Sequence, residues 1–418
     1  MSQDGNADAR CPVHDWATDY DVMDEDYTKE PGSIWADLRE RCPVAHTTRW
    51  GGSWMPTRYA DIQELANLVP ALSSRSVTVI PPDPELREEL IAELKMYGTE
   101  NPPITSDPPE HSAYKRLILP FFSPRAVAGY QQMTEDLCNG LLDKLEARVK
   151  AGNRECDGAV EYAQQIPPRV IAFILGIDMA RADEFTRWTQ ELLELGQTQP
   201  ELRRSARRKI MDFFFEEVAK RRNQPQDDLI SELLVTEVEG EKMSDHRVAG
   251  ICNLLLVAGI DTTWSSIGSA LYHFSTHPDD RARIAHDVSL LPTAVEELLR
   301  FYSPVTMARK VTEEISFQGA EMKPGEKVLM TFPAANRDPA VFDRPEEVVI
   351  DRQQNRHIAF GTGIHRCAGS NLARMELQVA LRCWFERFKD FELCDPAAVT
   401  WAGGQVKGPR NVPIRVLA

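Results

Sequence analysis

One cysteine of this sequence lies in a setting that suits chemistry better than core packing. Cys367 falls in the stretch HIAFGTGIHRCAGSNLARMEL, among glycines that permit tight turns and close approach to a flat ligand: Gly361, Gly363 and Gly369. His365 and Arg366 place donor or cationic groups beside the sulfur, and the helical pattern that follows offers N-terminal amides, so both favour a thiolate. No second cysteine or histidine lies at zinc spacing, so the metal should bring its own equatorial ligands. The stretch therefore predicts a haem with Cys367 as its axial ligand.

A second group of residues interrupts the longest apolar helical pattern, SDHRVAGICNLLLVAGIDTTWSSIGSALYHFSTHP. Ser244 is the expected N-cap, and the sequence before Pro278 ends a helix of roughly 30 residues, about 45 Å long. Gly259, Asp261 and Thr262 are unusual in its buried middle, because a buried carboxylate without partners is costly. One interpretation pairs Asp261 with a buried arginine and lets the threonines bond back to the helix. The other is an opening in the helix wall that passes protons.

The elements around these residues predict a mainly α protein with a small β region. Residues 1–25 are polar and acidic and are expected to form a flexible tail. Helical periodicity dominates from residue 111 to about 290, whereas segment 75–110 suggests a long loop with a helical insert. Short β-prone runs after Pro304, broken by Gly319 and Gly325, predict a small antiparallel sheet, and a last helix begins near Ser370.

Composition limits the classes of function. The chain has 418 residues and a formal net charge of -16, which argues against general nucleic-acid binding. Its start lacks a signal peptide, and the most apolar run is shorter than a membrane span, so we expect a cytoplasmic protein without a membrane anchor. The other seven cysteines are scattered and are expected to be free thiols.

Taken together, the motifs resemble those of the cytochrome P-450 family. The Cys367 stretch is similar to the haem-ligand signature FGxGxHxCxG, and AGIDTT at 258–263 resembles the oxygen-activation motif. ELLR at 297–300 resembles the ExxR pair, and DPPEH at 107–111 resembles the entry to a haem-contacting helix. The resemblance covers residues 26–418 and implies a single haem domain of the soluble bacterial branch, with haem between a long central helix and a Cys-ligand loop.

The resemblance also implies a role for each site residue. Haem b (iron protoporphyrin IX) would take Cys367 as its metal ligand, with these residues around it: Phe360, Gly361, Gly369, Ala258, His111, Lys115, Arg309 and His365. Of these, His111, Arg309 and His365 would hold the propionates, and Lys115 stands where an arginine is usual. Thr262 would hydrogen-bond the activated oxygen, and Asp261 would help to deliver protons.

Two further groups have different expected tasks. Glu297, Arg300 and Arg352 are expected to form a buried structural ion network. The substrate pocket is expected to include the following residues: Leu255, Ala258, Val305, Met307 and Val406. Because no charged residue obviously points inward, a small, largely apolar substrate is expected.

The implied reaction is the insertion of one oxygen atom of O2 into a C–H bond, by hydroxylation or O-dealkylation. The chain contains no flavin or ferredoxin module, so a separate ferredoxin is the expected electron donor. Two alternatives stay open at this point: a peroxide-driven peroxygenase and a haem sensor or carrier without catalysis. The Asp261–Thr262 pair argues against both, since neither needs a proton relay.

Overall fold

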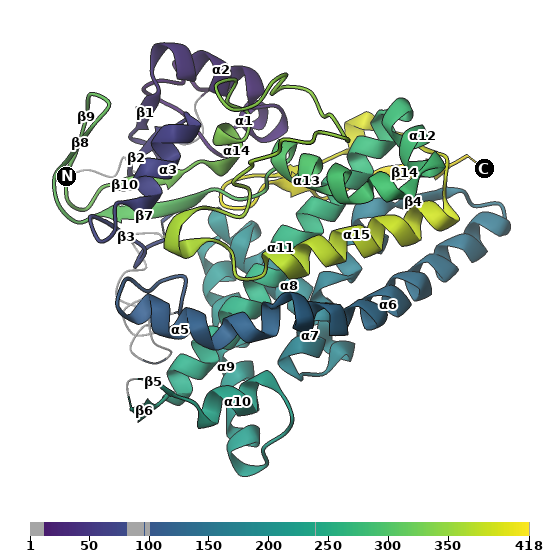
Figure 1. Ribbon diagram of the computed structural model, residues 1–418, viewed down its shortest axis with the longest axis horizontal. Helices are drawn as coiled ribbons and strands as arrows, with labels where there is room; N and C mark the ends of the chain where they lie inside the picture. Colours follow the sequence, from purple (N-terminus) through teal and green to yellow (C-terminus); the bar gives the residue numbers. More distant parts are fainter. Residues whose placement is uncertain (1–11, 82–95, 97–100, 239, 418) are drawn as a thin grey trace.

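A computed structural model describes residues 12–81, 96, 101–238 and 240–417 of the chain. Long helices make up most of the molecule, and the main sheet lies to one side of them (Figure 1). The helices are α1 (Glu25–Lys29), α2 (Gly32–Arg41), α3 (Tyr59–Asn67), α5 (Glu110–Ile118), α6 (Pro124–Lys150), α7 (Pro167–Leu175), α8 (Ala182–Leu193), α9 (Pro200–Asn223), α10 (Leu229–Val235), α11 (Asp245–Thr276), α12 (Pro278–His286), α13 (Leu291–Phe301), α14 (Phe332–Ala335) and α15 (Ser370–Arg387).

The strands are short, and in the described part of the chain they form one five-stranded sheet, one three-stranded sheet and three two-stranded sheets. They are β1 (Val44–Thr47), β2 (Ser53–Pro56), β3 (Leu72–Ser73), β4 (Glu155–Asp157), β5 (Glu237–Val238), β6 (Glu241–Lys242), β7 (Met307–Val311), β8 (Ile315–Phe317), β9 (Ala320–Met322), β10 (Lys327–Met330), β11 (Phe391–Leu393), β12 (Trp401–Ala402), β13 (Gly408–Pro409) and β14 (Pro413–Val416). The main sheet has the order β1-β2-β10-β7-β3, and β7 and β10 pair antiparallel with Met307 opposite Met330. The sheet predicted after Pro304 is therefore present.

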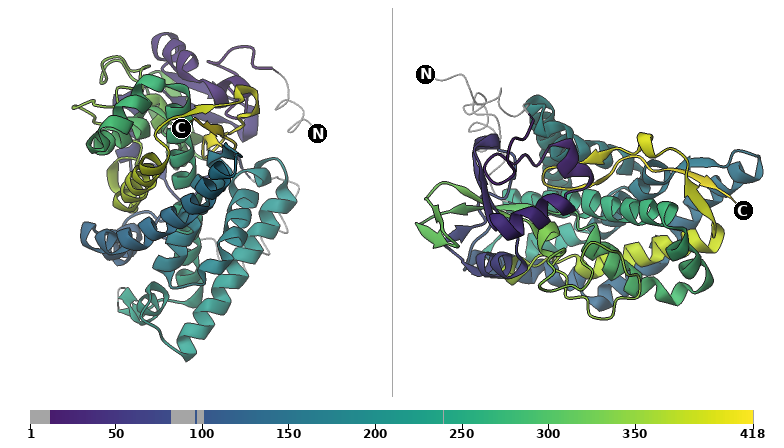
Figure 2. Two further views of the ribbon diagram at one scale, coloured as in Figure 1. Left: turned by 90° about the vertical axis from the view of Figure 1, so that its right-hand side faces the viewer. Right: turned by 90° about the horizontal axis from the view of Figure 1, so that it is seen from above.

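Helix α11 runs through the helical body (Figure 2). The Ser244 side chain accepts a hydrogen bond from the Arg247 amide and caps the helix, and the chain leaves it at His277, just before Pro278 starts α12. By length and composition alone α11 could cross a membrane, but 72% of its most apolar window is buried inside this structure. It is the central core helix, and α7, α9 and α15 pack against it.

The N-terminal part differs from the flexible tail expected over residues 1–25. Residues 1–11 lie outside the described part, but from residue 12 onward the chain packs against the sheet. Tyr20 is 1% exposed and donates a hydrogen bond to the Ser53 carbonyl at 2.9 Å. Arg49 donates to both carboxylate oxygens of Asp19 at 2.7 Å. The acidic composition suggested a solvated tail because the sequence does not show that Arg49 lies opposite these carboxylates.

Candidate active site

The Cys367 loop is a tight turn held by its own backbone. The Cys367 amide donates to the Phe360 carbonyl at 2.8 Å. Gly361 and Gly363 have φ values of +71° and +68°, a region that strains residues with a Cβ, which explains two of the three glycines. Lys115 on α5 donates to the carbonyls of Ile364 and Arg366, the second at 2.7 Å, and so ties that helix to the loop.

Some features around the Cys367 thiol raise its pKa, and others lower it. Burial raises the pKa of the thiol, and a hydrogen bond from the Gly369 amide and the charges of Lys115, Arg374 and Arg366 oppose that rise. The side chain is nevertheless accessible, because it faces a cavity rather than packed core. His365, which was expected to favour the thiolate, is not among the groups that shift this pKa, because its ring lies beside His111 and Ser74.

His365 belongs instead to a cluster of donor groups at one edge of the cavity. Its ring lies 4.2 Å from that of His111, and its Nε2 lies 2.8 Å from the Ser74 hydroxyl. Burial lowers the pKa of His365 to about 3 and that of His111 to about 4, so both rings are neutral at pH 7. His111 Nδ1 is buried and has no hydrogen-bond partner in the described part of the chain, and Arg309 is 6% exposed.

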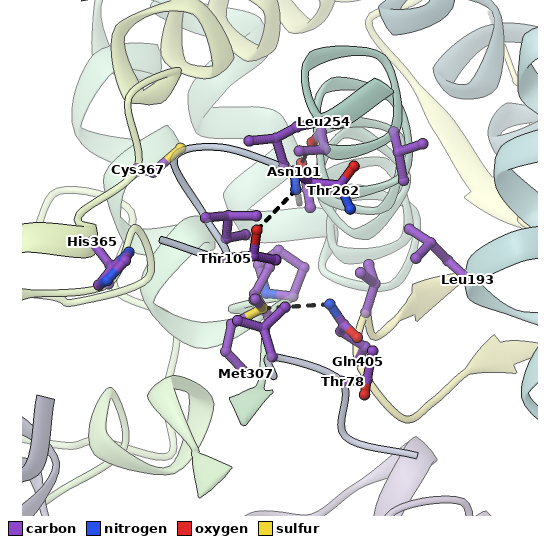
Figure 3. Close-up of a pocket in the computed structure, with 18 of the residues that line it drawn as sticks. Thr78, Asn101, Thr105, Leu193, Leu254, Thr262, Met307, His365, Cys367 and Gln405 are labelled. Atoms are coloured by element: carbon purple, nitrogen blue, oxygen red, sulfur yellow. Dashed lines mark hydrogen bonds between the residues drawn. The ribbon is translucent and has the colours of Figure 1, made fainter. Parts of the chain in front are cut away.

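These residues open onto one cavity of about 1680 Å³ (Figure 3). Every residue predicted for haem or substrate contact lines it: Leu255, Ala258, Val305, Met307, Val406, His111, Lys115, Arg309, Phe360, Gly361, His365, Cys367 and Gly369. Thr262 lines it as well, from α11, on a different wall from Cys367. The structure thus brings together residues that are more than 250 positions apart in the chain.

Helix α11 is continuous from Asp245 to Thr276, so its backbone is not broken at Gly259, Asp261 or Thr262. Gly259 gives room to a neighbour, since a Cβ at this position would lie 3.3 Å from Ile171 of α7. The Thr262 hydroxyl donates back to the Ala258 carbonyl at 2.8 Å. Its lone pairs remain able to accept a hydrogen bond in the cavity.

Asp261 points away from the cavity and pairs with a buried arginine, the other arrangement that the sequence allowed. Arg410 Nη2 lies 2.9 Å from Asp261 Oδ1, while its other nitrogens donate to Ser265 at 3.0 Å and Glu194 at 2.6 Å. The guanidinium also stacks 4.4 Å from the ring centre of Trp264. Burial raises the pKa of Asp261, and the charge of Arg410 opposes that rise.

The three residues predicted to form an ion network contact one another. Arg300 donates to both oxygens of Glu297 at 2.8 Å, and Arg352 donates to Glu297 Oε2 at 2.9 Å. The amide of Val349 and the side chain of Asn355 complete the contacts of this carboxylate. Glu297 and Arg300 are fully buried.

Sequence reasoning missed several polar groups in the cavity wall. The expectation that no charged residue points inward is wrong, because the lining includes these charged residues: Arg75, Arg203, Arg204, Arg207 and Glu376. Amide and hydroxyl groups are also present, and the side chain of Asn253 donates to Asn101 Oδ1 at 2.7 Å. Helical periodicity in the sequence could have placed Arg203 on a polar face of its helix. It could not have shown that this face lines the cavity.

Glu376 on α15 is the most buried of these charged residues, and it gives a testable pH dependence. It is 2% exposed, its Oε2 has no hydrogen-bond partner in the described residues, and burial raises its pKa to about 8. The unfolded chain ionises this carboxyl near pH 4.5, whereas the folded protein keeps the proton up to about pH 8. Folding therefore binds a proton within this window, and stability falls as pH rises through it.

Glu376→Gln removes the ionisable carboxyl, and with it the fall in stability as pH rises. We expect the variant to exceed the parent in unfolding free energy by about 1–3 kcal/mol at pH 8 and to match it near pH 5. Urea midpoints of the haem-loaded proteins at the two pH values measure this. Glu386→Gln, an exposed change on the same helix, is the control. An advantage of equal size at both pH values would contradict ionisation as its cause.

Comparison with known proteins agrees with the geometry. A sequence model of the family described as Cytochrome P-450 matches residues 192–398. Cytochrome P-450 107B1 of Saccharopolyspora erythraea is 32% identical over 94% of this chain and 97% of its own length. The 6-deoxyerythronolide B hydroxylase of the same organism is 33% identical over 91% and 95%. The structure of the polyketide synthase cytochrome PksS of Bacillus subtilis superposes with a TM-score of 0.83 at 28% identity, covering 96% of this chain and all of that one.

The chain belongs to the cytochrome P-450 family and is a haem monooxygenase. The site residues fit the family's cofactor, haem b. Cys367 offers its thiol to the cavity, and the described residues contain no cluster of three or more His, Cys, Asp or Glu side chains that would hold a metal ion instead. Arg309 and the orphaned His111 Nδ1 lie where an anionic edge needs donors. When bound, haem supplies the activation of O2 that the amino acids alone lack. Cys367, His111, Arg309 and His365 would hold it, while Lys115 ties α5 to the Cys367 loop.

Proposed function

We propose that this enzyme inserts one oxygen atom of O2 into a C–H bond of a small organic molecule in the cytoplasm, by hydroxylation or O-dealkylation. The observation that supports it best is that Cys367 and Thr262 face one cavity from different walls (Figure 3). Apolar side chains line much of the space between: Leu255, Ala258, Val305, Met307 and Val406. They orient a C–H bond by shape and keep bulk water from the reacting atoms.

Thr262 and Asp261 have distinct tasks in this proposal. The Thr262 hydroxyl, which already donates to Ala258, accepts a hydrogen bond in the cavity and fixes the position of a proton-carrying water. Asp261 lies one residue away, and its carboxylate, ion-paired with Arg410, would accept protons and pass them on. Ordered delivery of protons needs such a relay, because protons that arrive out of place release peroxide instead of product.

Electrons would come from a separate ferredoxin that docks near the Cys367 loop. Arg366 in this loop and Arg116 on the adjoining α5 are exposed, and Lys115 joins the two segments. Positive charge on this face suits an acidic carrier protein, although the whole chain is acidic.

Turnover with two oxidant systems tests the proposal. A small-molecule library is first screened for the spin-state change that follows displacement of distal water. Hits are then incubated with NAD(P)H, ferredoxin, ferredoxin reductase and O2, or with peroxide alone. Oxygenated product carrying 18O from 18O2 in the first mixture supports the proposal. Product only with peroxide identifies a peroxygenase, and product in neither mixture with any hit identifies a carrier.

Thr262→Ala tests the proposed hydroxyl directly. We expect unchanged haem content, product per NAD(P)H lower by about tenfold or more, and a matching rise in peroxide. Thr262→Ser keeps the hydroxyl and is expected to retain most of the coupling. The measurement is the ratio of product to peroxide at equal NAD(P)H consumption. An alanine variant with parental coupling would assign Thr262 only to helix structure.

A further inference from the structure

Arg203 is a charged group in the cavity wall that the proposed reaction leaves without a task. It lies in the first turn of α9, and its Nη1 donates to the Ile80 carbonyl at 3.2 Å. No carboxylate in the described part of the chain forms an ion pair with it. By contrast, Arg204 pairs with Glu201 at 3.0 Å, and Lys209 pairs with Glu191 at 3.1 Å.

The backbone fixes Arg203 in this place. A Cβ added at Gly196 would lie 2.6 Å from the Cβ of Arg203, so the corner between α8 and α9 is closely packed there. Burial lowers the pKa of Arg203, and the charge of Arg207 lowers it further, while no acid among the described residues acts in the opposite direction. A desolvated guanidinium without a counter-charge is costly, and an anion in the cavity would remove that cost.

Gln405 is a second donor at the same corner. Arg203, Gln197 and Gln405 border one small hollow beside Ile80 and Leu193. The Gln405 amide donates to the Met307 sulfur at 3.5 Å, a weak acceptor that an oxygen anion would replace favourably. Figure 3 shows Gln405, Thr78 and Leu193 on the side of the cavity away from Cys367.

We propose that this corner is an anion subsite, and that the substrate is an amphipathic carboxylate. Arg203 would bind the carboxylate, with Gln405 as a second donor, and the apolar part of the molecule would extend toward Thr262 and Cys367. A planar guanidinium matches the two oxygens of a carboxylate better than a point charge does. This inference rests on the proposed function, because it assumes that the cavity holds the substrate. It also replaces the expectation of a largely apolar substrate.

Azole ligands that coordinate haem iron test the subsite without any turnover. The probes are ω-(imidazol-1-yl)alkanoic acids with 8, 10 and 12 carbons, the matching ω-alcohols, and the matching 1-alkylimidazoles. Each is titrated into the haem-loaded enzyme, and the Soret shift gives its Kd. At the best chain length, the carboxylate is expected to bind about 10- to 100-fold more tightly than the alcohol.

Variants assign the preference to one side chain. Arg203→Leu should weaken the best carboxylate by about 10- to 100-fold and the alcohol by less than about threefold. Arg203→Lys keeps the charge without the planar fork, so its Kd for the best carboxylate should lie between those of the parent and of Arg203→Leu. Arg208→Leu is the matched control, since Arg208 is an exposed arginine on the same helix and not a cavity residue. It should leave all three probe series unchanged.

The outcomes separate the two proposals. Unsubstituted imidazole reports whether an accessible haem is bound, which is a readout of the proposed function alone. Equal Kd values for carboxylate and alcohol at every length in a protein that binds imidazole would overturn the anion subsite. So would a carboxylate preference that survives Arg203→Leu, or one that Arg208→Leu removes equally.

Discussion

Replacing Cys367 with histidine is expected to abolish both the spectral signature and the activity of the enzyme. The reduced, CO-bound parent should show the red-shifted Soret band of a thiolate-ligated haem, and the variant should lack it. The thiolate donates electron density that favours O–O cleavage, whereas a neutral imidazole donates less. Oxygenated product should fall below detection, while some haem binding persists through the remaining contacts of Arg309, His111 and His365.

The structure offers a cysteine control for this change. Cys394 is half-buried, donates to the Pro413 carbonyl at 3.2 Å and does not line the cavity. Cys394→Ser should therefore keep the parental CO spectrum and turnover. A red-shifted band that survives in Cys367→His would contradict the assignment of the axial ligand, and its loss in Cys394→Ser would point to general damage.

Part of this site could be predicted from the sequence because it depends on residues that are close together in the chain. Two glycines of the loop have positive φ and lie close to the cysteine in the sequence. A few consecutive residues are therefore enough to predict the turn. Glu297 and Arg300 are three positions apart on α13, a spacing that helical geometry turns into a contact. Capping by Ser244 and the proline after α11 likewise act within a few residues.

Contacts between distant segments could not be predicted in the same way. The arginine beside Asp261 is Arg410, 145 positions from Ser265, to which it also donates. Its place is set by the C-terminal strands, and nothing near Asp261 in the sequence identifies it. Arg203 reaches the cavity only because Gly196 lets α8 and α9 meet closely. The acidic composition of the N-terminus was misleading for the same reason, because the Arg49 that pairs with Asp19 lies 30 positions further along the chain.

Glu297→Ala is expected to have the largest effect on stability. The carboxylate accepts hydrogen bonds from Arg300, Arg352, Val349 and Asn355, and both it and Arg300 are fully buried. Its removal leaves two guanidinium groups without their counter-charge in a solvent-free place, at a cost of about 3–5 kcal/mol. Whole domains are stable by only about 5–15 kcal/mol, so most of the protein should be recovered unfolded or without haem.

The measurement is the yield of soluble protein with a thiolate CO spectrum, compared with Glu313→Ala, which removes an exposed glutamate. Glu297→Gln keeps the shape and one acceptor oxygen but not the charge, so its yield should lie between those of the alanine variant and the parent. This ordering follows only if the network acts through its charge, because lost packing alone would leave the glutamine variant at parental yield. Parental haem content in Glu297→Ala would show that the fold tolerates two unpaired buried arginines, and the structural role of the network would then be wrong.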